Sequence, residues 1–140
     1  MRGRAIGYVR VGKTGEGPDQ YLAGRQIDVI SEWAADNEAD VFDWYFDIGV
    51  DDTEPFGQRS AGAKLLDRVG RGDITQVVVA SLPVLGKGRA LLDAVQLLFE
   101  AKKGLCVITV LPGPHDVAEA DEVGAHRRAR ADGPSALKAA

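Results

Sequence analysis

The sequence predicts a three-layer α/β domain in which helices flank a mainly parallel sheet of four or five strands. Strand-like runs rich in Val, Ile and aromatic residues alternate with helical runs, which is the order of right-handed crossover units. One strand-like run, Thr75–Leu82, has a continuous apolar stretch and so suits burial on both faces. The 140 residues fit one domain, and 45% hydrophobic with 27% charged residues is an ordinary globular composition.

Four segments carry the strand signal, because β-branched and aromatic residues are concentrated in them. These segments are Arg4–Val11, Val41–Phe46, Thr75–Leu82 and Leu105–Leu111. Polar loops that contain glycine and proline, Gly12–Pro18 and Asp47–Gln58, follow the first two strands.

Three segments between the strands predict helices. They run from Asp19 to Asp36, over Ser60–Val69 and over Gly88–Lys103. Asp19 is suited to cap the first helix, and Gly70 to end the second. The third helix has the clearest pattern, because apolar residues recur in it at helical spacing: Leu91, Ala94, Val95 and Leu98.

Residues 1–111 are therefore the expected domain, and residues 112–140 a C-terminal tail. Pro112-Gly113-Pro114 breaks the alternation of elements. The tail is acidic and then basic, and it has few large apolar residues. We expect it to be partly helical, over about residues 116–131, and disordered at its end, ADGPSALKAA.

Short motifs stand in a recognisable order along this framework. They are YVRVG at 8–12, DIGV at 47–50, RSAGAKLL at 59–66 and LPVLGK at 82–87, with Gln26, Ile30, Trp33 and Ala34 on the first helix. Together they resemble the N-terminal catalytic domain of serine recombinases, the resolvase/invertase family, over roughly residues 4–111. The resemblance implies a resolvase-like fold and DNA recombination chemistry.

The position that corresponds to the family's nucleophile is Gly12. In the family the first strand ends in Tyr-x-Arg-Val-Ser, and that serine attacks a DNA phosphodiester. Glycine has no side chain and supplies no nucleophilic oxygen. The Thr14 hydroxyl is two residues further on, about 6–7 Å along an extended chain, which is too far to keep catalytic geometry.

The charges implied by the resemblance are also incomplete. Arg10 matches one active-site arginine of the family, and Arg59 matches a second. The family's third strand runs into Leu-Asp-Arg-Leu-Ser-Arg, but here Pro83 and Val84 replace the Asp-Arg pair, and Lys87 replaces the last arginine. Lysine lacks the bidentate guanidinium fork that suits phosphate. We therefore expect a degenerate site without functional catalytic residues.

This interpretation predicts a catalytically inactive, serine-recombinase-like domain that serves as a protein-assembly or regulatory module. The partners expected are a second copy in a homodimer or higher oligomer, and a recombinase-like protein. The alternative is a DNA-binding, strand-exchange protein with residual activity. Net charge is −4, so DNA binding is expected to be weak at most.

The tail adds little to DNA recognition. About 25 residues follow Pro114, too few for the DNA-reading domain that continues many family members, and Arg127, Arg128 and Arg130 suit a solvated basic face. The N-terminus lacks a signal peptide pattern, and no apolar run approaches the roughly 18–20 residues of a membrane span. We therefore expect a cytoplasmic protein without membrane contact.

A rival motif lies at Gly7–Thr14, which matches the phosphate-loop pattern G-x-x-x-x-G-K-[ST] letter for letter. Its four intervening residues read as strand, and glycines and a proline after Lys13 oppose the helix that should begin there. Phosphate or nucleotide binding at this segment is thus the less favoured second alternative.

We expect no cofactor and no metal site. His115, Asp116 and His126 lack a recognisable ligand spacing, and the acidic residues between 47 and 54 lack a calcium-loop pattern.

Overall fold

The computed structural model describes residues 4–13, 22–111 and 135–138. Its strands are β1 (Arg4–Val11), β2 (Asp40–Ile48), β3 (Gln76–Val79), β4 (Cys106–Thr109) and β5 (Ser135–Lys138). Its helices are α1 (Ala23–Asp36), α2 (Ser60–Gly70) and α3 (Arg89–Ala101), with 3-10 turns at Phe56–Gln58 and Leu82–Val84. None of the helices in these ranges is long and apolar enough to cross a membrane.

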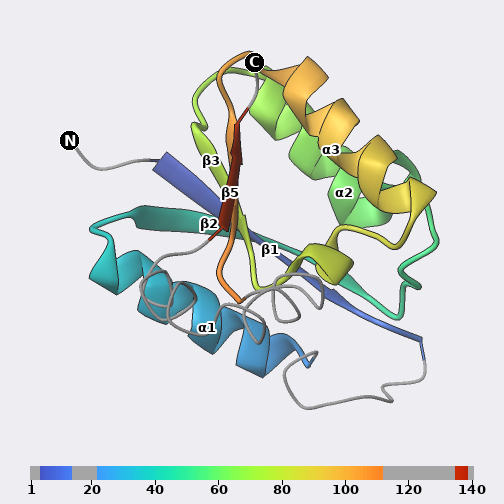
Figure 1. The fold of residues 1–140 in the computed structure, drawn as a ribbon, viewed down its shortest axis with the longest axis horizontal. Coiled ribbons are helices and arrows are strands. Elements are labelled where there is room, and N and C mark those ends of the chain that lie inside the picture. The colour runs from blue at the N-terminus through green and yellow to red at the C-terminus, as the bar shows by residue number, and fades with distance from the viewer. Residues whose placement is uncertain (1–3, 14–21, 112–134, 139–140) are drawn as a thin grey trace, which may run out of the picture.

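The elements form three layers (Figure 1). The middle layer is a five-stranded sheet of order β2-β1-β3-β4-β5, in which the first four strands are parallel and β5 is antiparallel. One face of the sheet is covered by α1, and the other by α2 and α3. The predicted fold class is confirmed.

Each face of the sheet carries its own core, because alternate residues of a strand point to opposite sides. On the α2 and α3 face, Ile6 and Tyr8 of β1 pack with Leu65 of α2 and Leu98 of α3. On the α1 face, the buried residues are Ala5, Ile30, Trp33, Ala34, Val78 and Ile108. β1, which lies between β2 and β3, is buried along almost its whole length, so both layers depend on it.

Three strands end at positions that differ from the prediction. β4 stops at Thr109, where the sequence predicted strand to Leu111. β2 continues to Ile48, because it pairs with the whole of β1 and its last residues lie opposite Arg10 and Val11. Asp47 is therefore part of a strand and not of a solvated loop. β3 stops at Val79, and a 3-10 turn that contains Pro83 follows, where the sequence predicted strand to Leu82. Proline lacks the N–H that a strand ladder needs.

The tail prediction is wrong for Ser135–Lys138, which form β5 where disorder was expected. These residues pair antiparallel with β4, and the pairing gives hydrogen-bond partners to an edge that would otherwise be open. Sequence patterns could not show this, because the strand depends on a long-range backbone partner. The predicted Asp19 cap is wrong, because α1 begins at Ala23 with Leu22 at its N-cap. The predicted helix at 116–131, Thr14, both histidines and the tail arginines lie outside the described residues.

Gly62, in the first turn of α2, is required by a close backbone approach. A Cβ at this position would collide with the carbonyl oxygen of Phe56 in the preceding 3-10 turn. Backbone cannot give way as a flexible side chain can, so the turn and α2 can meet here only at a glycine.

We expect Gly62→Ala to lower the free energy of unfolding by about 1–3 kcal/mol, because the added methyl group forces the turn away from α2. Urea unfolding measures this loss. Gly24→Ala is the matched control, since a Cβ at Gly24 in α1 meets nothing within 4 Å. The control should be neutral or stabilising by up to about 1 kcal/mol. Equal losses in the two variants would contradict the proposed collision.

Candidate functional site

Four polar side chains meet at the ends of β1 and β2, on the face that α2 and α3 cover. Tyr8 and Arg10 come from β1, Asp47 from β2, and Arg59 from the residue directly before α2. The register of the parallel strands β1 and β2 explains part of this arrangement, because it places Arg10 opposite Asp47. All four are buried, and Arg59 has no exposed surface. We call these residues the arginine cluster.

The Arg10 guanidinium is held by backbone carbonyl groups. Its Nε donates to the oxygen of Val84 at 3.1 Å, Nη1 to Val50 at 2.8 Å and Nη2 to Pro83 at 3.0 Å. Its backbone is fixed as well, because the Gln26 side-chain amide donates to the Arg10 carbonyl and accepts from its N–H. Burial lowers the pKa of Arg10, and the positive charge of Arg59 lowers it further.

The Arg59 guanidinium lies beside the same carbonyl group. Its Nη1 donates to Val84 at 3.0 Å and to the Tyr8 hydroxyl at 3.1 Å, while Nε donates to the carbonyl of Glu54 at 2.9 Å. Within the described residues, the remaining nitrogen, Nη2, is buried and has no hydrogen-bond partner. The Val84 carbonyl thus accepts from both arginines and joins them.

Asp47 links the strands to α2. One carboxylate oxygen accepts from the N–H of Ala61 at 2.8 Å, and the other from the N–H of Gly62 at 3.0 Å and from the Tyr8 hydroxyl at 2.7 Å. A carboxylate at a helix N-terminus satisfies free N–H groups and interacts favourably with the helix dipole. No side chain within α2 or next to it does this, since Arg59 at the N-cap makes no side-chain cap.

Residues 83 and 84, two of the predicted site positions, lie directly against the arginine cluster. Pro83 and Val84 end the 3-10 turn, and both turn their carbonyl oxygens toward Arg10. Lys87 lies apart from these contacts: its side chain is exposed, and its N–H donates to the carbonyl of Asp52. The structure therefore brings together four of the six predicted site residues: Arg10, Arg59, Pro83 and Val84.

Gly12, the fifth, directly follows β1. A Cβ on Gly12 would have the Arg10 Nη1 as its nearest neighbour, at 3.9 Å, so there is space for a side chain. The residues between Gly7 and Gly12 are strand, as the sequence predicted. An extended segment differs from the wrapped backbone of a phosphate loop.

Sequence reasoning did not find three features of the arginine cluster. Tyr8 and Asp47 were noted only as parts of motifs, and Asp47 was placed in a solvated loop. The carbonyl groups of residues 50, 83 and 84 could not be found at all, because backbone acceptors leave no residue-type signal. An aspartate near the end of a strand that is followed by a helix without its own cap is the signal that was available for Asp47.

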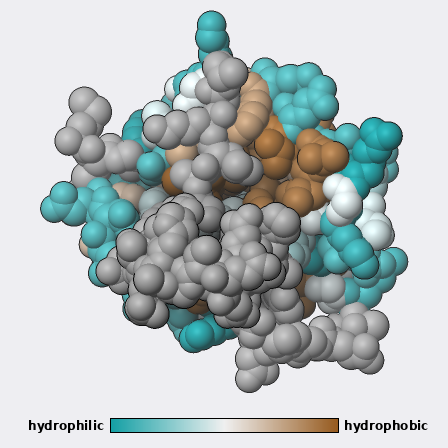
Figure 2. Space-filling view, viewed as in Figure 1, coloured by the Kyte–Doolittle hydropathy of each residue, from teal (hydrophilic) through white to brown (hydrophobic). Residues whose placement is uncertain are grey.

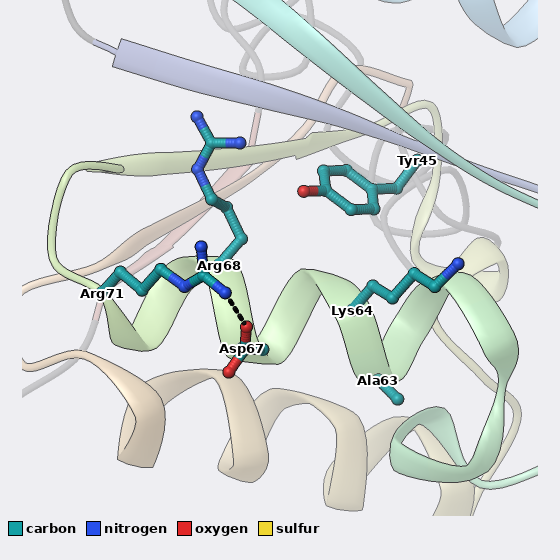
Figure 3. Close-up of a pocket in the computed structure, with 6 residues that line it drawn as sticks. All are labelled: Tyr45, Ala63, Lys64, Asp67, Arg68 and Arg71. Carbon is teal, nitrogen blue, oxygen red and sulfur yellow. Dashed lines mark hydrogen bonds and ion pairs between the residues drawn. The ribbon is translucent and has the colours of Figure 1, made fainter.

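A second concave region, with a volume of about 470 Å³, lies between β2 and α2 (Figure 3). It is lined by Tyr45, Ala63, Lys64, Asp67, Arg68 and Arg71. Its arginines are paired with carboxylates: Arg71 with Asp67 at 2.7 Å, and Arg68 with Asp43 at 3.2 Å and Asp73 at 3.3 Å. The hydrogen bond from Arg68 lowers the pKa of Asp73. Little positive charge is left over here for a ligand.

No metal centre is formed by the described residues, among which no three His, Cys, Asp or Glu side chains come together. The acidic loop after β2 is used within the fold. Asp47 binds the N-terminus of α2, and Asp51 lies 3.9 Å from the Lys13 ammonium.

Comparison with known proteins gives the family. The sequence signature of the resolvase N-terminal domain matches residues 5–123, most of the chain. The chain belongs to the resolvase N-terminal domain family. No curated protein shows a significant sequence match to it.

Solved structures are similar to this resolvase-family domain in fold. The N-terminal catalytic domain of TP901-1 integrase superposes with a TM-score of 0.64 at 22% identity, covering 76% of each chain. The catalytic domain of ISC1926 TnpA, an IS607-like serine recombinase, gives 0.62 at 21% identity over 88% of this chain and 78% of its own. A resolvase family site-specific recombinase from Streptococcus pneumoniae gives 0.58 at 16% identity, covering 92% and 90%.

Removal of the Asp47 carboxylate should destabilise the domain strongly. We expect Asp47→Ala to lower the free energy of unfolding by about 3 kcal/mol, because two backbone N–H groups and the Tyr8 hydroxyl lose a charged acceptor in a buried place. Urea unfolding measures the loss. Asp51→Ala is the control, and it should cost at most about 0.5 kcal/mol because Asp51 is exposed and only loosely paired. A similar small loss at Asp47 would contradict its role as the cap of α2.

Alkaline pH should test the burial of Tyr8. Burial raises the pKa of the Tyr8 phenol above its ordinary value, and the hydrogen bond from Arg59 opposes that rise. Below a pH of about 10, the buried neutral phenol makes its full contribution to the free energy of unfolding. This contribution decreases as the pH rises from about 10 toward the pKa of Tyr8 in the folded state. The stability difference between wild type and Tyr8→Phe should therefore narrow by about 1.4 kcal/mol per pH unit above 10. Urea unfolding from pH 8 to 11 measures it, and a constant difference would contradict the argument.

Proposed function

We propose that this resolvase-family domain does not cleave DNA and acts as an assembly or regulatory module in recombination. Family membership supports a recombination-related function. The observation that carries the proposal is the state of Arg10: every nitrogen of its guanidinium donates to a backbone carbonyl, and two of those carbonyls belong to Pro83 and Val84.

The DNA cleavage reaction that the resemblance implies has two requirements. Attack on a phosphodiester needs a nucleophilic oxygen, and the charge that develops on the phosphate needs guanidinium groups that are free to bind it. Here the first strand ends at Val11, and the residue that follows, Gly12, has no hydroxyl group. Three of the five N–H groups of the Arg10 guanidinium already donate to the carbonyls of Val84, Val50 and Pro83, so at most two are left for a phosphate.

If the domain does not cleave DNA, association with other protein chains is the function that its fold can still serve. The proposed partners are a second copy of the chain and a recombinase of the same family. DNA is the less suited partner, because the net charge is −4 and the arginines of α2 are paired with carboxylates. The module would act by joining or blocking recombinase assemblies.

One observation favours the alternative, residual strand exchange. Arg59 Nη2 is a buried donor without a partner in the described part of the chain, and an anion could satisfy it. This alternative differs from the proposal in a measurable way, since it requires that the site work again once a hydroxyl is supplied.

We expect Gly12→Ser to form no covalent DNA adduct, because Arg10 remains bound to carbonyls although there is room for the serine. The variant is incubated with supercoiled plasmid, quenched with SDS and examined for protein-linked DNA. Gly12→Ala is the matched control, since it restricts the backbone equally and lacks the hydroxyl. An adduct with Gly12→Ser and not with Gly12→Ala would refute the proposal and support residual activity.

A second measurement does not depend on the DNA sequence. Phenylglyoxal modifies accessible guanidinium groups, and peptide mass spectrometry reports each site separately. We expect Arg10 to react at least about tenfold more slowly than exposed Arg71, because Arg10 is 8% exposed and its nitrogens are occupied. Fast modification of Arg10, protected by added inorganic phosphate, would contradict the proposal.

A further inference from the structure

The strand β2 forms an open edge of the sheet. It stands at one end of the strand order, and no other described strand pairs with its outer side (Figure 1). Its nine residues, Asp40–Ile48, make it the longest strand of the described chain. A long edge strand presents N–H and C=O groups that a further extended segment can bind, and proteins usually shorten such edges or place charges on them.

The backbone groups that face away from β1 belong to alternate residues of β2. The Trp44 N–H donates to the Asp43 carboxylate at 2.9 Å, so it is turned away from the ladder with β1. Successive residues of a strand turn their backbone groups to opposite sides, so Phe46 and Ile48 face the same way as Trp44. Asp43 thus occupies the edge at Trp44, whereas no contact within the described ranges occupies the outward groups of Phe46 and Ile48. We call the outward side of residues 45–48 the β2 edge.

One face of the β2 edge is apolar. Two of the five exposed large hydrophobic residues of the described chain lie here: Phe46 is 43% exposed and Ile48 is 61% exposed. Trp44 packs against the core on the α1 side, and Phe46 and Ile48 share its face because they follow at intervals of two. The Phe46 ring stacks on Trp44, with centroids 6.4 Å apart and planes inclined by 15°. A partner that covered Phe46 and Ile48 would remove apolar surface from water.

The opposite face of the β2 edge is polar. Tyr45 packs on the α2 side and lines the concave region beside α2 together with Lys64 and Arg68 (Figure 3). Arg68 and Arg71 are paired with carboxylates, whereas Lys64 is exposed and makes no ion pair within the described residues. One positive charge is therefore available on this side of the strand.

We propose that the β2 edge binds an extended segment of another protein, which adds a strand to the sheet. The side chains of such a strand alternate between the two faces. Apolar residues at every second position would cover Phe46 and Ile48, and acidic residues between them would lie on the side of Lys64. This inference rests on the assembly role proposed above and assigns to it a surface and a kind of partner.

A second copy of β2 fits this edge less well. The carboxylates that it would bring to the side of Lys64 are Asp43 and Asp47, and both are already bound. Asp43 binds Arg68 and the Trp44 N–H. Asp47 binds the N-terminus of α2. DNA also fits poorly, because a single unpaired lysine contributes little to phosphate binding and the apolar face would stay uncovered.

A synthetic peptide tests the β2 edge. The probe is a fluorescein-labelled peptide of about seven residues, with valine at alternate positions and glutamate between them. We expect fluorescence polarisation to show saturable binding to the full chain, with a dissociation constant in the micromolar range. Ile48→Asp should raise this constant at least about tenfold, because a carboxylate replaces an apolar contact. Absence of binding at about 1 mM peptide would overturn the proposal.

Leu92→Asp is the matched control for Ile48→Asp. Leu92 is 67% exposed and lies on α3, alongside which Figure 2 shows another hydrophobic surface. The control should bind the peptide as the wild type does, and equal losses in the two variants would overturn the assignment to β2. Circular dichroism verifies that both variants remain folded.

Methylation of the peptide backbone tests strand addition itself. Alternate residues of an added strand direct their N–H groups toward β2, and the others direct them to solvent. Two peptides are therefore compared, each N-methylated on one of the two alternating sets. We expect one of them to bind at least about tenfold more weakly than the unmodified peptide and the other to bind as well as it. Equal affinity of the two methylated peptides would overturn backbone pairing at the edge.

Charge reversal tests the position of the acidic residues. Lys64→Glu should weaken binding of the valine–glutamate peptide at least about threefold and strengthen binding of a valine–lysine peptide by a similar factor. Lys103→Glu is the matched control, since Lys103 is exposed beyond the end of α3 and gives the same change in net charge. It should change the binding of neither peptide. Equal effects of the two variants would overturn the placement of acidic side chains beside Lys64.

The outcomes separate this inference from the proposed function. If the peptide does not bind and the wild type forms a dimer that Ile48→Asp dissociates in sedimentation velocity, the edge belongs to a second copy. That result would overturn the proposed partner and leave the assembly role intact. None of these measurements bears on the absence of DNA cleavage, which the Gly12→Ser experiment decides by itself.

Discussion

The buried carboxylate of Asp47 is the interaction on which the arrangement of the site depends. It receives two N–H groups from the first turn of α2 and the hydroxyl of Tyr8 from β1. A buried charge is tolerated only where hydrogen bonds replace its water shell, and here three donors do so. Because Arg59 directly precedes α2, the same contact that places the helix also places the guanidinium next to Tyr8 and Val84.

The arginine cluster shows how a chain can bury two neighbouring cations without an anionic side chain for each. Burial lowers the pKa of Arg10, and repulsion from Arg59 lowers it further. Backbone carbonyl oxygens from the 3-10 turn at Leu82–Val84 offset this, since each carries a partial negative charge and one of them is shared. Pro83 and Val84 carry no side-chain charge, so this turn offers only its backbone as the acceptor for both arginines.

The distribution of charge and apolar surface favours protein partners over DNA. The arginines of α2 are balanced by carboxylates, and the net charge of the chain is negative. A phosphate backbone is bound by cations that are free to exchange with counterions, and paired cations contribute little to this. The exposed Phe46 and Ile48 side chains of the β2 edge offer the opposite kind of surface, one that gains free energy by leaving water.

Local sequence was sufficient for the elements and their order, because helical and strand periodicities are properties of short segments. Such patterns predicted the bounds of β1, the helix ends at Asp36 and near Val69, and the parallel crossovers. Gly12, Pro83 and Val84 were likewise visible in the sequence, since each stands in one of the short motifs.

What only the tertiary structure decided is where backbone groups find their partners. The last residues of β2, the strand β5 and the carbonyl contacts of Arg10 all depend on chain segments far apart in sequence. Every residue carries the same carbonyl and N–H groups, so residue type cannot say which of them will meet. The sequence by itself therefore determined that a glycine stands at position 12, directly after the first strand, and the packing decided that Arg10 is held by carbonyls of the chain itself.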